Sequence, residues 1–258
     1  MDSVNPENAA AIVEAPRERR VFGFWGTLLW GCFVFAAMFV GQITVVGYVV
    51  LQKDAGISLK EAIQAAAGNG TTIAMSVIMG LPAVAAALWL AIRFTSTPFA
   101  DYLALRRTSW KNLLIGVIGL VALLAGWEVM SDLLGHESSP GFMSDVVTST
   151  HGDGAFLLLI FAFCVAAPVS EELFARGFLY RGWSETALGP IGAIVLSSIV
   201  WTSLHLQYGP YFFAEVFTLG LWFGYLRYRS GSTWLTIVLH GLNNLGAVVQ
   251  TIWLAGHG

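Results

Sequence analysis

Long apolar runs separated by short polar clusters are the feature that most restricts how this chain can fold. Seven runs cover approximately residues 21–52, 71–94, 113–135, 154–180, 191–206, 211–229 and 234–255. A helix needs about 20 apolar residues to cross the hydrocarbon core of a bilayer. Because the open edge of a sheet cannot face lipid, the runs predict an all-α, polytopic membrane bundle of about seven transmembrane helices.

The composition agrees with this class and excludes others. Only 11% of the residues are charged, whereas 56% are hydrophobic, and a soluble domain has about 25% charged residues. A net charge of -3 without a basic stripe argues against nucleic-acid binding. The two cysteines, Cys32 and Cys164, lie inside apolar runs, so we interpret them as small packing residues.

The polar segments define the expected domain organisation. Residues 1–20 are predicted to be a disordered cytoplasmic tail and not a signal peptide, because the first apolar run begins late and is long. Residues 21–258 are predicted to form one membrane-embedded domain. Within it, residues 53–70 suggest a short surface helix, and residues 95–112 suggest a loop.

The distribution of lysine and arginine predicts the orientation. With the N-terminus in the cytoplasm, the outside loops hold only Lys53 and Lys60, and the other eleven of the 13 basic residues lie inside. Short cytoplasmic loops are enriched in such residues. We therefore expect an integral membrane protein with a cytoplasmic N-terminus and the C-terminus outside.

Two adjacent carboxylates follow the fourth apolar run. Glu172 and Arg176 are four residues apart and can pair on one helix face, whereas Glu171 points about 100° away. Pro168 is expected to kink the helix just before them. Ionisable residues at membrane depth suggest a functional site, but the glutamates could equally cap the run at the interface.

Polar side chains on two later runs could join them. His205 lies near the end of the fifth run, and His240 and Asn244 are one helical turn apart in the seventh. Taken singly, each residue can be interpreted as a packing residue or as an interhelical hydrogen-bonding residue. Together they supply a carboxylate, two imidazoles and an amide. The remaining histidines, His136, His151 and His257, fall in outside loops or the tail.

These motifs resemble those of a known family. The patterns Glu171-Glu172-x-x-x-Arg176, aromatic-x-x-x-His205 and His240-x-x-x-Asn244 are similar to the signature of the CPBP (Abi) intramembrane proteases, which include the type II CAAX prenyl endopeptidases. The resemblance covers about 155–250, inside a protease-like core of about 154–255. Trp201 stands where the family usually has phenylalanine.

The resemblance implies an intramembrane endopeptidase that hydrolyses peptide bonds near the cytoplasmic membrane face. Glu171 with His205 would activate water, and His240 and Asn244 would bind the oxyanion or complete a metal site. Arg176 would hold Glu172 and the local helix geometry, as structural support. The expected partners are the lipid bilayer and a membrane protein or lipid-modified peptide as substrate.

The need for a metal stays open at this point. Glu171, His205 and His240 form the His₂Glu set that some catalytic zinc sites use, so one divalent ion, zinc foremost, is a candidate cofactor. The short His-Glu-x-x-His signature is absent. An amide such as Asn244 is a good oxyanion donor, and this slightly favours a metal-free mechanism.

Two other functions remain as alternatives. The chain could be a proteolytically inactive immunity or binding protein, or a transporter or proton relay, because intramembrane Glu and His also mark ion pathways. The intact polar set argues against the first. The lack of an inverted repeat argues against the second.

The spans also raise a geometric difficulty. They put Glu171 and His240 towards the cytoplasm and His205 towards the outside. The fifth run has only 16 residues, about 24 Å of helix, so the turn after it could lie within the membrane. Glu215, early in the sixth run, could then approach the cavity, but a structural or interfacial role is favoured for it. Glu128 and Asp132 are interpreted as interfacial groups.

Overall fold

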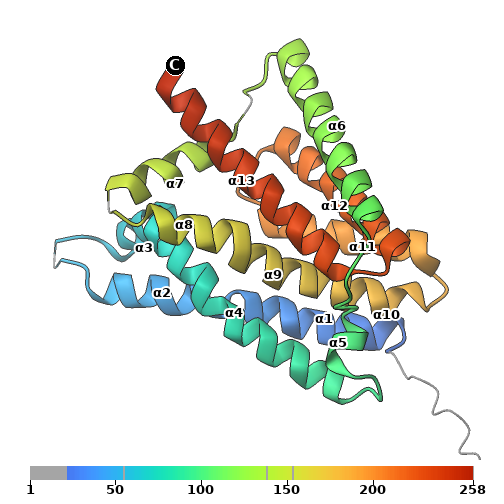
Figure 1. Cartoon of the computed structure of the whole chain (residues 1–258). Helices are drawn as coiled ribbons and strands as arrows, with labels where there is room; N and C mark the ends of the chain where they lie inside the picture. Colours follow the sequence, from blue (N-terminus) through green and yellow to red (C-terminus); the bar gives the residue numbers. More distant parts are fainter. Residues whose placement is uncertain (1–21, 55, 138, 153, 258) are drawn as a thin grey trace, which may run out of the picture.

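The computed structural model describes residues 22–54, 56–137, 139–152 and 154–257, and within these ranges all regular structure is helical (Figure 1). The prediction of an all-α fold is therefore confirmed. The predicted tail at residues 1–20 lies outside the described residues.

The helices follow the predicted apolar runs closely. The first run forms two helices, α1 and α2, that meet at Phe39, and the later runs form single long helices. Their bounds are α1 Phe24–Met38, α2 Val40–Leu51, α4 Gly70–Arg93, α6 Trp110–Leu134, α11 Gly189–Thr202, α12 Pro210–Ser230 and α13 Thr233–His257.

The fourth run forms one continuous helix from Phe156 to Ser184 that widens from α-helical to π-helical winding twice. It consists of α8 (Phe156–Phe161), the π-helical turn η2 (Ala162–Ala166), α9 (Ala167–Glu172), a second π-helical stretch η3 (Leu173–Leu179) and α10 (Tyr180–Ser184). Pro168 has no N–H to donate to the preceding turn, and the wide turn η2 lies directly before it. Wide turns of this kind are frequent at functional sites.

Five helical segments in the described part of the chain are long and apolar enough to cross a membrane: 24–51, 70–93, 110–134, 156–184 and 233–256. The helical segment 189–205 is apolar but shorter. The number of seven spans and the predicted orientation therefore stay predictions. In Figure 1 the start of α1 and the end of α13 lie at opposite ends of the bundle.

The shorter helices lie between the long ones. α3 (Leu59–Gly68) confirms the predicted surface helix, and the Ser58 side chain caps it together with Glu61. A single turn, α5 (Phe99–Tyr102), lies in the expected loop. α7 (Gly141–Gly152) was not expected, because its segment was interpreted as an outside loop.

The packing of α7 explains why its sequence pattern is weak. Met143, Val146 and Val147 are buried in a cluster with Ala74 of α4 and Val248 of α13. The apolar face of α7 is only a few residues wide, and it is buried only because α4 and α13 cover it. The covering helices therefore stabilise α7 more than its own propensity does.

α2 and α4 cross at close range. A Cβ atom on Gly41 would collide with the backbone at Ser76 and Gly80, whereas a Cβ on Gly47, in the same helix, would meet nothing within 4 Å. The two glycines of this helix therefore differ in packing.

We predict opposite effects of alanine at these two positions. Gly41→Ala should lower the free energy of unfolding by about 1–3 kcal/mol because α2 and α4 must separate. Gly47→Ala should be neutral or stabilise slightly, because alanine is the better helix former. Thermal unfolding of the purified variants in detergent measures both. Equal effects of the two substitutions would contradict the close crossing.

Candidate active site

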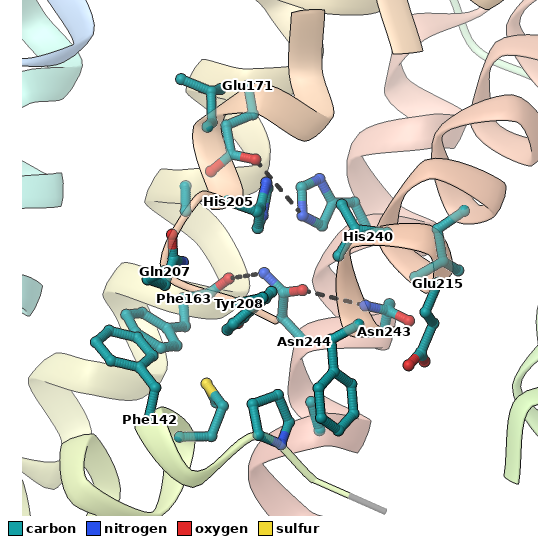
Figure 2. A pocket seen from close by; sticks show the side chains of 18 of the residues that line it. Phe142, Phe163, Glu171, His205, Gln207, Tyr208, Glu215, His240, Asn243 and Asn244 are labelled. Carbon is teal, nitrogen blue, oxygen red and sulfur yellow. Dashed lines mark hydrogen bonds and ion pairs between the residues drawn. The ribbon is translucent and has the colours of Figure 1, made fainter. Parts of the chain in front are cut away.

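Four of the residues selected from the sequence line one cavity of about 260 Å³ (Figure 2): Glu171, His205, His240 and Asn244. The predicted spans placed Glu171 and His205 towards opposite membrane faces, but in the structure they meet at this cavity. The fourth helix continues to Ser184, and Glu171 therefore lies near its middle.

The position of His205 follows from the short fifth run. α11 ends in the 3₁₀ turn η4 (Ser203–His205), and the chain turns before α12 begins at Pro210. Gln207 and Tyr208 of this turn line the same cavity. The expectation that this turn belongs to a protein-lined cavity agrees with the structure, since irregular backbone at membrane depth is tolerated there.

The Glu171 carboxylate is oriented by a tryptophan. The indole N–H of Trp201 donates to Oε2 of Glu171 at 2.7 Å, and the same oxygen lies 3.9 Å from Nε2 of His240. A separation of 3.9 Å is too long for a hydrogen bond but is compatible with a water that bonds both groups. The sequence places Trp201 four residues before His205 but does not show this contact.

His205 is fixed by the same tryptophan residue. Its Nδ1 donates to the Trp201 carbonyl oxygen at 3.3 Å, so the neutral imidazole keeps an acceptor lone pair on Nε2. Among the described residues no direct hydrogen bond joins Glu171 to His205. Trp201 precedes His205 by four residues, and this one-turn spacing was the signal in the sequence.

Asn244 connects α13 to the wide turn η2. Its Nδ2 donates to the carbonyl oxygen of Phe163 at 2.8 Å, and its Oδ1 accepts from Asn243 at 3.3 Å. Because a side-chain amide has two N–H donors, one donor remains for a group in the cavity. The N–H that bonds Phe163 anchors the π-helical backbone that precedes the two glutamates.

The predicted pair between Glu172 and Arg176 is present and fully buried. Nη1 of Arg176 donates to Oε1 of Glu172 at 3.0 Å, and both side chains have 0% exposure. Nη2 donates to the carbonyl oxygen of Gly220 in α12 at 3.0 Å. The guanidinium also lies 4.4 Å from the ring centroid of Trp201, where a cation is attracted to the ring face.

Glu172 has a second contact that the sequence did not reveal. Its Oε1 also accepts from Nδ1 of His240 at 3.0 Å. This bond directs Nε2 of His240 towards the cavity and Glu171. Glu172 is therefore a positioning residue for the site as well as a partner of Arg176.

The three proposed metal ligands do not form a metal site as they are placed. In the described ranges no group of three or more His, Cys, Asp or Glu side chains is arranged to hold a metal ion. The donor types of Glu171, His205 and His240 suit zinc, but their positions do not.

The remaining acidic residues differ in position. Glu215 lines the cavity, which was the less favoured of its two interpretations. Glu128 is exposed at the end of α6 and accepts from Nε2 of Gln250 at 3.1 Å. Asp132 is exposed as well. The exposure of Glu128 and Asp132 agrees with an interfacial location.

We predict that Arg176→Ala lowers the free energy of unfolding by about 3–5 kcal/mol, because it leaves the buried Glu172 charge without a partner. The chain offers a matched control in Arg181, whose i,i+4 pair with Glu185 is partly exposed. Arg181→Ala should cost about 0–1 kcal/mol. Thermal unfolding and membrane abundance measure both. A stable Arg176→Ala protein that has lost only activity would instead make Arg176 catalytic.

Comparison with known proteins provides an independent assignment. Residues 153–246 match the family described as type II CAAX prenyl endopeptidase Rce1-like. No curated protein and no solved structure gives a significant match. The matched segment contains Glu171, His205, His240 and Asn244. Residues 153–246 of this chain are therefore similar to the Rce1-like family, in agreement with the family that the three motifs predicted.

Proposed function

We propose that the protein is a CAAX-type intramembrane endopeptidase in which Glu171 is the central catalytic group. The observation that supports this most strongly is the convergence of a carboxylate, two imidazoles and an amide from three helical segments on one cavity. Peptide hydrolysis needs a base for water and donors for an oxyanion, and this set supplies both.

The first step is the activation of water. A water between Glu171 Oε2 and His240 Nε2, which are 3.9 Å apart, lies where Glu171 can accept its proton. His205 offers its free Nε2 as a second acceptor on the same cavity. The water oxygen then attacks the scissile carbonyl carbon, and the proton is held by the carboxylate or the imidazole.

The second step is the stabilisation and collapse of the tetrahedral intermediate. The remaining N–H of Asn244 donates to the oxyanion, and so does Nε2–H of His240, which acts as an imidazolium from the start of the cycle and first donates to the attacking water. Glu172 stabilises the imidazolium through its bond to Nδ1 of His240. When the C–N bond breaks, the proton taken from water is delivered to the departing amine. The products are this amine and a carboxylic acid, which releases the second water proton to solvent and becomes a carboxylate.

The substrate class follows from the location and the family. A cavity within a membrane bundle favours a peptide that is itself held at the membrane, and the Rce1-like match points to a prenylated peptide. We propose cleavage near the cytoplasmic membrane face, in line with the predicted orientation. Inactive binding or transport are the competing functions.

We predict that Glu171→Gln reduces cleavage by about 10²–10⁴-fold, the range expected for loss of a general base. Quantitative comparison of the membrane proteomes of wild-type and Glu171→Gln cells should reveal accumulated precursors. Purified protein in liposomes should cleave the corresponding peptides, and the control Glu185→Gln should retain activity. Ion flux that depends on Glu171 without any peptide cleavage would favour a transporter.

We also propose that catalysis is metal-free, because each of the four residues then has a role and an amide such as Asn244 suits an oxyanion better than zinc. Enzyme treated with a strong chelator, and verified to be free of metal by elemental analysis, should keep its activity. Complete loss of activity that stoichiometric zinc restores would instead make Glu171, His205 and His240 metal ligands.

A further inference from the structure

Glu215 of α12 is the one acidic side chain in the catalytic cavity, besides Glu171, that the proposed mechanism does not use. Its side chain is half-buried. Among the described residues, no group donates a hydrogen bond to its carboxylate or forms an ion pair with it. A partly buried carboxylate without a partner is unfavourable in a membrane bundle and suggests a substrate contact.

The charges around the cavity are unbalanced. No lysine or arginine lines it, and the nearest buried guanidinium, Arg176, already bonds Glu172 and the Gly220 carbonyl. Glu128 adds a further negative charge that acts on Glu215. A cavity with low-dielectric walls and charges of one sign attracts groups of the opposite sign.

Glu215 lies close enough to the catalytic centre to contact the same substrate. Tyr208 lines the same cavity as Glu171 and Glu215. Figure 2 shows these two glutamates on opposite sides of His240, with Glu215 beside Asn243. A peptide bound with its scissile bond at Glu171 can therefore place a neighbouring side chain at Glu215.

We infer that Glu215 is a specificity-determining residue that binds the ammonium or guanidinium group of a basic side chain in the substrate peptide. This inference rests on the proposed peptidase function and deepens it. A neutral hydrogen-bonding group would leave the carboxylate charge uncompensated, whereas a lysine or arginine side chain neutralises it and bonds to it. The selected substrates therefore carry a basic residue near the scissile bond.

Equilibrium binding tests this inference without requiring turnover. The probes are fluorescent prenylated peptides in which lysine, or norleucine as a neutral analogue, is placed at each residue around the scissile bond in turn. The full chain in lipid nanodiscs is titrated as wild type, Glu215→Gln and, as the control, Glu128→Gln. Glu128 is acidic and near Glu215 but does not line the cavity.

We expect wild type to bind the lysine peptide about 10-fold more tightly than the norleucine peptide at one position, which corresponds to about 1.4 kcal/mol. Glu215→Gln should lose this preference while it binds the norleucine peptide normally, which also shows that it is folded. Glu128→Gln should keep the preference. Glu215→Lys should prefer a peptide with glutamate at that position.

Other results would overturn the inference. Equal or undetectable binding of the lysine and norleucine peptides by wild type would do so, as would a lysine preference that persists in Glu215→Gln. Cleavage measured on the same peptides separates this inference from the proposed function. A lysine preference that depends on Glu215, without any cleavage, supports the binding role of Glu215 and contradicts the proposed peptidase function. Cleavage without the lysine preference supports the peptidase function and contradicts the binding role of Glu215.

Discussion

The buried ion pair between Glu172 and Arg176 is the interaction on which the rest of the site depends. Two charges at 0% exposure are tolerated only when they pair with each other and form hydrogen bonds to further groups. Glu172 also accepts from His240 of α13, and Arg176 also donates to Gly220 of α12 and lies against Trp201 of α11. The pair thus fixes the helices that carry the catalytic groups relative to one another.

The wide turns on either side of this segment explain how two adjacent glutamates acquire different roles. η2 precedes α9 and η3 follows it, so Glu171 and Glu172 lie on a short α-helical segment between two changes of winding. Glu172 faces the protein interior, and Glu171 faces the cavity. Asn244 holds η2 through Phe163, which couples an oxyanion donor to the backbone that orients the base.

The apolar runs and the one-turn spacings predicted the helices and the candidate residues, because both depend on local periodicity. The contacts of Trp201 and Glu172 could not be predicted, since they join residues 30 and 68 positions apart in the chain. α7 was not predicted, because its apolar face is buried only by contacts with α4 and α13. For Glu215 the sequence left a position at the cavity and a position at the interface both open, because it shows that a residue is near a helix end but not which cavity the residue faces.

The most direct test of this account is a double-mutant cycle on the buried pair, with Glu172→Gln, Arg176→Gln and both together. Unfolding free energy and peptide cleavage are measured for each. The double variant should lose less stability than the two single losses added together, by about 0.5–3 kcal/mol, because neither charge is left alone. Its cleavage should stay low, because His240 lacks its carboxylate. Additive stability losses, or restored cleavage in the double variant, would contradict the account.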